Sequence, residues 1–202
     1  ENLETYVVER FDKTDDGIRL GYEDFTTLMK KPNDPDAKYT GSYEALLNAT
    51  YLYTGSSIEV EKMYKYIVFN CLIGNGDAHL KNFALQYSSD MTNIFVSPTF
   101  DITHTLIYKT IDNKMALKLN GGKEFPNTSD LIRLAQNDQI KIRNPKEIIE
   151  SLSENIIEYL KSSNEVQLFD GLRTSIECSV SNIMTSNISA KPYRHDKKRK
   201  FE

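Results

Sequence analysis

A strongly apolar helix pattern that stops at a polar loop dominates the sequence. Ser56-Ser57-Ile58-Glu59 fits a capping box at the start of this helix. Beyond it, apolar residues recur at a spacing of three and four, as in Val60, Met63, Tyr64, Ile67, Val68, Cys71 and Leu72. The helix is predicted to end at Gly74-Asn75-Gly76, because glycine permits the positive φ angles that stop a helix. Such a helix is buried, so a core must anchor the loop behind it.

Two short β-like segments follow that loop. Residues 83–87 and 93–96 are strand-like and are separated by five residues, Ser88 to Thr92, which predicts a β-hairpin. A further strand is expected at residues 6–11, before a turn, and another at residues 115–119.

Helices are expected to dominate the rest of the chain, after a loop at residues 30–41. One begins near Thr128 or Ser129, and a second has Asn144 as its N-cap and Pro145 in its first turn. The second helix is predicted to bury Ile148, Leu152, Ile156 and Leu160, and a last helix is predicted to carry Leu168, Leu172, Ile176 and Ile183. The order of strand, helices, hairpin and helices predicts an α+β fold with helices in the majority.

Charge is distributed unevenly along the 202 residues. The net charge is −4, but residues 191–202 carry +4, so residues 1–190 carry −8. An acidic body argues against direct nucleic-acid binding by the folded part, since phosphate neutralisation needs clustered Lys and Arg. The tail with Lys197-Lys198-Arg199-Lys200 is expected to be either a frayed terminus or a contact for RNA, DNA, an acidic partner or a targeting receptor.

The sequence contains no apolar run of membrane-spanning length and no signal-peptide pattern at its start, so we expect a cytoplasmic protein without a membrane partner. Cys71 and Cys178 are far apart and both lie in helical patterns, which predicts buried thiols rather than a disulfide or zinc site.

The residues that indicate chemistry lie between the apolar helix and the hairpin, in Asn75-Gly76-Asp77-Ala78-His79-Leu80-Lys81-Asn82. Asp101 follows the hairpin, nineteen residues after Asn82. Because the hairpin returns the chain toward its start, Asp77, Asn82 and Asp101 are predicted to converge on one site.

Phosphoryl transfer uses this set of side chains. A kinase needs an Asp that accepts or orients the proton of the acceptor hydroxyl, and oxygen ligands that hold Mg²⁺ on the phosphates. The spacing favours Asp77 as the base and Asn82 and Asp101 as Mg²⁺ ligands. Lys81 could neutralise the transferred phosphate, and His79 could orient the loop or simply bond to a carbonyl. His104 and His195 are expected to be structural and solvated, respectively.

Residues 69–83, together with Ser97-Pro98-Thr99-Phe100-Asp101-Ile102, resemble the C-terminal lobe of the HipA-like serine/threonine kinases, the toxins of bacterial toxin–antitoxin systems. Residues 6–12 resemble the hinge strand of that family, and residues 21–25 and 115–120 match it as well. The resemblance covers residues 6 to about 185. It implies a mainly helical kinase C-lobe with a hinge strand and a small hairpin at the active site.

The resemblance also implies an activity and its cofactors, ATP and Mg. Asp77 would accept the proton, and Asn82 and Asp101 would bind Mg²⁺. The residues that would line the nucleotide are Glu9, Arg10, Phe11, His79, Lys81, Asn82, Phe100 and Asp101. The implied division is a hinge strand over residues 1–12, a kinase C-lobe over residues 13–190 and a basic tail over residues 191–202.

Family members act on aminoacyl-tRNA synthetases and bind a helix-turn-helix antitoxin. The resemblance therefore implies a protein substrate and such a partner, with nucleic acid contacted only through the antitoxin.

One part of a kinase is not found in the sequence. A Gly-rich phosphate loop and a strand Lys normally precede the hinge, and Asn120-Gly121-Gly122-Lys123 is instead expected to be a tight turn. We therefore expect the N-lobe to be supplied in cis or in trans, and the isolated chain to be inactive. Two alternatives stay open: a partner-binding lobe, and a phosphotransferase like the phosphatidylinositol kinases, whose catalytic loop is similar.

Overall fold

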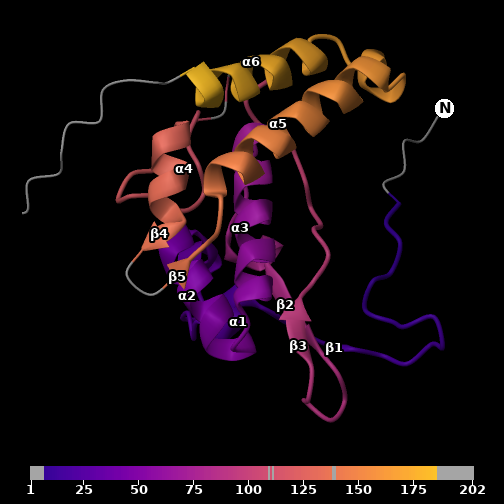
Figure 1. Cartoon of the computed structure of the whole chain (residues 1–202). Helices are drawn as coiled ribbons and strands as arrows, with labels where there is room; N and C mark the ends of the chain where they lie inside the picture. The colour runs from indigo at the N-terminus through magenta and orange to yellow at the C-terminus, as the bar shows by residue number, and fades with distance from the viewer. Residues whose placement is uncertain (1–6, 109, 111, 138–139, 186–202) are drawn as a thin grey trace, which may run out of the picture.

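A computed structural model describes residues 7–108, 110, 112–137 and 140–185 (Figure 1). Helix α3 (Ser57–Leu72) runs through the middle, with α5 (Pro145–Ser162) and α6 (Leu172–Thr185) across one end. The remaining helices are α1 (Phe25–Leu28), α2 (Tyr43–Thr54), α4 (Thr128–Leu134) and the 3₁₀ segments Pro35–Tyr39, Leu80–Asn82 and Glu165–Leu168. The strands are β1 (Gly21–Asp24), β2 (Ala84–Tyr87), β3 (Ile94–Val96), β4 (Gln136–Asn137) and β5 (Ile140–Lys141). This arrangement confirms the α+β class with helices in the majority.

Helix α3 begins and ends as predicted, but its start is built differently. The Ser56 hydroxyl accepts a hydrogen bond from the amide of Glu59 at 3.4 Å. The Glu59 carboxylate does not return the bond to Ser56; it accepts from the backbone amide of Val96 at 2.6 Å. The ammonium of Lys62 donates to the carbonyl of the same Val96 at 2.6 Å. Helix α3 therefore holds both backbone groups of one residue of β3, which fixes the hairpin on the core.

The hairpin prediction is confirmed. Strands β1, β2 and β3 form an antiparallel sheet in that order, with Leu85 opposite Val96 and Tyr87 opposite Ile94. The predicted strand at residues 6–11 is wrong for its described part, since residues 7–11 are not in a strand. Both edges of β2 are already paired, so the carbonyl of Phe11 accepts instead from the Gln86 side chain at 2.7 Å. Tyr6 lies outside the described residues.

Residues 115–119 form isolated bridges, not the expected strand, because Lys118 pairs with Ser42 and Leu119 with Gly122. The second of these bridges closes the turn predicted at residues 120–122.

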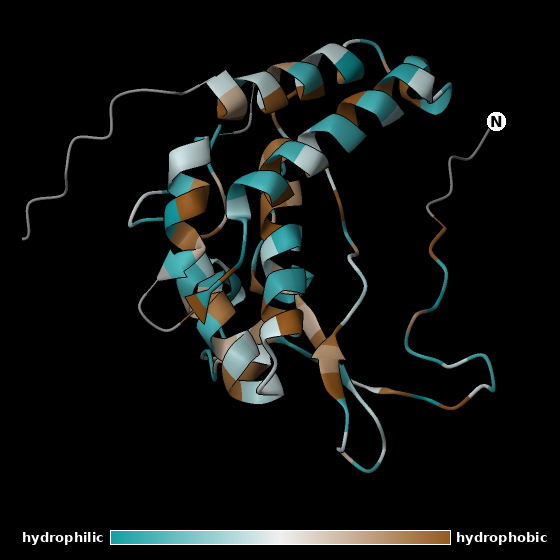
Figure 2. Cartoon of the chain, in the orientation of Figure 1, coloured by the Kyte–Doolittle hydropathy of each residue, from teal (hydrophilic) through white to brown (hydrophobic). Residues whose placement is uncertain are grey.

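Three predictions about the helices need correction. Cys71 is buried as expected, at 1% exposure, but Cys178 is exposed because α6 turns only one face to the core. Helix α5 buries Ile156 and Leu160 as predicted. In its first turns the buried face is shifted by one residue to Ile149 and Ser153, and Ile148 and Leu152 are only partly covered. Leu168 precedes the last helix and is 78% exposed. Figure 2 shows the resulting mixture of hydrophilic and hydrophobic residues along α5 and α6.

In the part of the chain that the structure describes, no helix has the length and apolar character needed to cross a membrane. The basic tail and His195 lie outside the described residues.

Candidate active site

The loop after α3 is held from inside by the side chain of Asn75, which is 2% exposed. Its Nδ2 donates to Asn70 Oδ1 at 2.7 Å. Its Oδ1 accepts from the backbone amide of Asp77 and from the hydroxyl of Thr103, both at 3.0 Å. One buried amide thus joins the end of α3, the loop with Asp77 and the segment that follows Asp101. The sequence placed Asn75 at the helix stop and at the start of the polar loop, but no pattern pointed to this structural role.

Two further contacts tie the same segments together. The amide of Gly76 donates to the hydroxyl of Thr105 at 2.8 Å. A Cβ atom at Gly76 would lie 2.7 Å from both the carbonyl oxygen of Lys114 and Thr105 Oγ1, so a side chain has no room there. His104 bonds to the carbonyl of Ile73 and, at 2.7 Å, to the hydroxyl of Ser175, in accord with the structural role expected for it.

The side chains of Asn82 and Asp101 are in direct contact. Asn82 Nδ2 donates to Asp101 Oδ2 at 2.6 Å, across the hairpin that separates them in the sequence. Asp101 has a φ of +54°, a left-handed conformation that is uncommon outside glycine and that aims its side chain at Asn82. Strained residues of this kind cluster at functional sites. The predicted convergence of these two residues is therefore present in the structure.

Asp77 lies in the same loop, just before the 3₁₀ turn that carries Asn82. Its Oδ1 accepts a hydrogen bond from the hydroxyl of Tyr39 at 3.3 Å. Tyr39 also meets the ring of His79 edge-on, with centroids 5.3 Å apart. Tyr39 precedes Asp77 by 38 residues, and no local pattern in the sequence pointed to it.

His79 is nearly buried, at 6% exposure, and its Nδ1 has no hydrogen-bond partner among the described residues. Burial lowers the pKa of His79, and the nearby charge of Lys38 lowers this pKa further, which outweighs the opposing effect of Asp77. The imidazole is therefore neutral at pH 7. A neutral, packed ring beside the loop suits a residue that positions the backbone.

The residues predicted to line a nucleotide divide into two groups. Phe11 stacks on Phe100 with centroids 5.6 Å apart, and Tyr22 lies 6.1 Å from Phe100, so an aromatic cluster forms beside Asp101. Glu9 and Arg10 are exposed, and Arg10 pairs with its neighbour Asp12.

Lys81 is exposed in the 3₁₀ turn that also carries Asn82. Among the described residues, no hydrogen bond or ion pair joins Glu9, Arg10 or Lys81 to Asp77.

The donor set near Asp101 fits a hard cation. Asn82 Oδ1 is buried without a hydrogen-bond partner in the described structure, and Asp101 supplies a carboxylate next to it. No group of three His, Cys, Asp or Glu side chains that could hold a metal occurs among the described residues. Two protein oxygens completed by phosphates and water are the usual way in which Mg²⁺ is bound, whereas zinc requires more protein ligands.

With this geometry in view, comparison with known proteins is informative. A sequence model described as HipA-like C-terminal domain matches residues 1–160. The chain belongs to this family. A solved structure of similar fold is the HipA chain in a Shewanella oneidensis complex of HipA, HipB and operator DNA, with a TM-score of 0.67 and 15% identity. The match covers 86% of this chain and 47% of that chain.

Two curated relatives come from Sinorhizobium fredii. "Putative kinase Y4dM" is 34% identical over 119 residues, which cover 58% of this chain and 28% of the relative. "Putative kinase Y4mE" is 30% identical over 125 residues, which cover 56% of this chain and 28% of the relative. The HipA-like chain therefore spans well under half of the curated relatives it matches.

Proposed function

We propose that this chain is the C-terminal lobe of an ATP- and Mg²⁺-dependent kinase that transfers the γ-phosphate to a serine or threonine hydroxyl of a protein. The observation that carries the proposal is the 2.6 Å contact between Asn82 and Asp101, with Asp77 in the loop before Asn82. Family membership and the kinase names of the two relatives support it. The acidic body disfavours an anionic lipid as the acceptor, which is why we rank the lipid-kinase alternative lower.

In this proposal Asp77 accepts the proton of the acceptor hydroxyl. The hydrogen bond from Tyr39 engages Oδ1 of Asp77, so the hydroxyl would approach Oδ2. Asn75 holds the backbone amide of Asp77 and thereby positions the carboxylate. A positioned base of this type contributes roughly 10²- to 10⁴-fold to the rate.

Asn82 and Asp101 would hold the metal ion through Asn82 Oδ1 and the Asp101 carboxylate. Bound Mg²⁺ would neutralise phosphate charge. The contact from Asn82 Nδ2 to Asp101 orients both groups, because it fixes which atom of the amide is left to accept.

The aromatic cluster of Phe11, Tyr22 and Phe100 would pack against the adenine, with the backbone of Glu9 and Phe11 as its hydrogen-bonding edge. Arg10, His79 and Lys81 would complete the nucleotide surroundings.

We propose that the chain is divided into a hinge segment (residues 1–12), a lobe (residues 13–190) and a basic tail (residues 191–202). The Gly-rich loop and the strand Lys would come from an N-lobe in cis or in trans.

The deciding experiment replaces Asp77 in the protein that includes its N-lobe. Asp77→Asn is expected to lower phosphate transfer to protein by at least about a hundredfold, with an unchanged thermal melt. Asp16→Asn makes the same chemical change in an exposed turn and should leave transfer intact. Undiminished transfer in Asp77→Asn would show that the assignment is wrong.

An antitoxin partner is a second part of the proposal. The solved HipA chain of similar fold is part of a complex with HipB and operator DNA. We propose that a helix-turn-helix antitoxin binds this protein and that nucleic acid is contacted only through this antitoxin. We also propose an aminoacyl-tRNA synthetase as a candidate substrate and the cytoplasm as the compartment. Co-purification with the product of an adjacent helix-turn-helix gene tests the first point. Failure to form a complex with purified product would argue for a kinase that acts without an antitoxin.

A further inference from the structure

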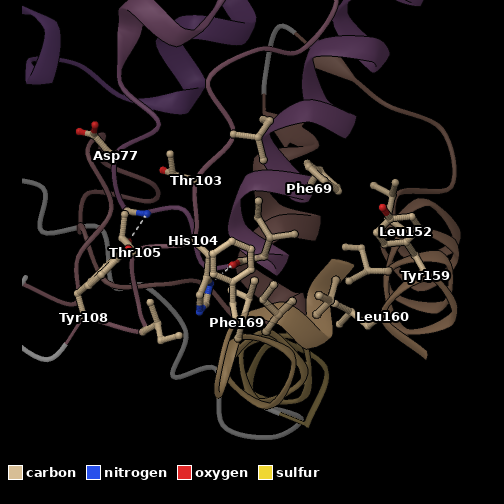
Figure 3. A pocket seen from close by; sticks show the side chains of 18 of the residues that line it. Phe69, Asp77, Thr103, His104, Thr105, Tyr108, Leu152, Tyr159, Leu160 and Phe169 are labelled. Carbon is tan, nitrogen blue, oxygen red and sulfur yellow. Dashed lines mark hydrogen bonds between the residues drawn. The ribbon is translucent and has the colours of Figure 1, made fainter. Parts of the chain in front are cut away.

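A large cavity opens beside the loop that carries Asp77. It has a volume of about 1030 Å³ and lies between the end of α3, the inner sides of α5 and α6, and the segment of residues 102–108 (Figure 3). Gly76 and Asp77 belong to its lining, so the cavity is continuous with the proposed catalytic position. Figure 3 shows Asp77 at one edge and Leu152 and Tyr159 on the opposite side.

The walls of the cavity are apolar. Phe69, Leu152, Ile156, Leu160 and Ile176 form much of the lining. Its mouth carries exposed aromatic side chains, because Tyr108 and Tyr159 are each 58% exposed and Phe169 is 59% exposed. A contiguous apolar patch that stays open to solvent is typical of a binding surface.

Most polar groups of the lining already have partners within the protein. His104 uses both ring nitrogens, Thr105 accepts from Gly76, and Thr103 donates to Asn75. These groups therefore do not call for a polar ligand. The cavity gains most from an apolar occupant, since removal of apolar side chains from water is favourable in proportion to the area buried.

The charges around the cavity restrict the occupant further. No Lys or Arg is among the described residues that line it, whereas Asp77 and Asp112 are. Asp112 is paired with Lys114 at 3.4 Å, outside the lining, and Asp77 lies at the edge of the cavity. Among the lining residues that the structure describes, a nucleotide triphosphate or an anionic phospholipid would meet a carboxylate and no cation, so a neutral or basic occupant is favoured.

We propose that this cavity, the acceptor pocket, receives the apolar side chains that flank the phosphorylated hydroxyl in an extended segment of the acceptor protein. The proposal rests on the proposed kinase function, because it places the hydroxyl at Asp77. Side chains on either side of the hydroxyl residue then reach the apolar walls, and the aromatic mouth covers them. The pocket thereby selects a serine or threonine with large apolar neighbours.

The test uses the protein that includes its N-lobe and two fluorescent peptides. Both have a central serine and lysine ends, and the flanking residues are Leu and Phe in one and Gln in the other. The apolar peptide is expected to bind at least about tenfold more tightly by fluorescence anisotropy, equal to about 1.4 kcal/mol. Phe169→Glu and Tyr159→Ala should each reduce this preference, and both sites are more than half exposed, so the fold is retained. Leu52→Glu changes an exposed leucine on α2, outside the pocket, and should keep the preference.

The same mixtures with Mg·ATP separate the two proposals. A preference in binding without phosphate transfer supports the cavity as a site for apolar side chains, but it counts against the kinase and overturns the placement of an acceptor hydroxyl at Asp77. Equal transfer to both peptides, or a preference that neither pocket variant changes, overturns the pocket and leaves the kinase standing. Binding of phosphatidylinositol vesicles that Phe169→Glu abolishes also overturns it, because the occupant would then be a lipid.

Discussion

Replacing Asn75 by alanine is the sharpest test of how this fold holds the loop that carries Asp77. The substitution removes three hydrogen bonds at once, two accepted by Oδ1 and one donated by Nδ2. It leaves the amide of Asp77 and the hydroxyl of Thr103 without their partner. Water has little access to these groups, because the wild-type Asn75 is only 2% exposed. At about 0.5–1.5 kcal/mol for each bond, the expected loss in the free energy of unfolding is about 3 kcal/mol.

Urea denaturation of the 202-residue chain, followed by circular dichroism, measures this loss. Asn164→Ala is the matched control, because Asn164 is exposed and makes no side-chain cap bond at the start of its 3₁₀ segment. In the protein with its N-lobe, Asn75→Ala should also lower kcat more than it raises the KM for ATP, since Asp77 loses its backbone anchor. A loss in unfolding free energy below about 1 kcal/mol, the worth of one such bond, would refute the reasoning, because water would then satisfy the exposed partners.

Three further predictions rest on single contacts. Gly76→Ala should destabilise the fold by about 1–3 kcal/mol in urea, because its Cβ would lie 2.7 Å from a backbone oxygen; Gly122→Ala has open space and should be nearly neutral. Glu59→Ala should lower the free energy of unfolding, measured by thermal or urea denaturation, by about 1.5–3 kcal/mol, because the hydrogen bond from Val96 is lost. The control Glu61→Ala breaks only an exposed ion pair with Lys65 and should lower it by less than about 0.5 kcal/mol. The pKa of His79 is lowered in the folded state, so the unfolded chain binds the proton first, and the free energy of unfolding should fall as the pH drops through 6.5. His79→Gln should reduce this dependence of stability on pH. An unchanged pH dependence in the variant would exclude His79 as its source.

Local sequence patterns were sufficient for the elements around the site. The apolar repeat of α3, its stop at Gly74 and the presence of the hairpin follow from periodicity and turn residues, which act over a few positions. The approach of Asn82 to Asp101 could be predicted because a short hairpin returns the chain to its start. Strand pairing was less predictable: residues 7–11 have a β-like composition, but both edges of β2 were already occupied.

Contacts between distant segments could not be read in advance. Tyr39 reaches Asp77 and Thr103 reaches Asn75 because packing of the core brings their segments together. The rotated face of α5, which leaves Leu152 to line the cavity, likewise depends on how that helix meets α3 and α6.

The amino-acid sequence by itself determined the α+β class and indicated the candidate metal ligands and the candidate proton acceptor, because these candidates follow from spacing along one loop and one hairpin. Only the tertiary structure decided which of these groups are held in place, and that an apolar cavity opens beside Asp77. Those features depend on the relative placement of helices distant in sequence, where packing complementarity governs the result.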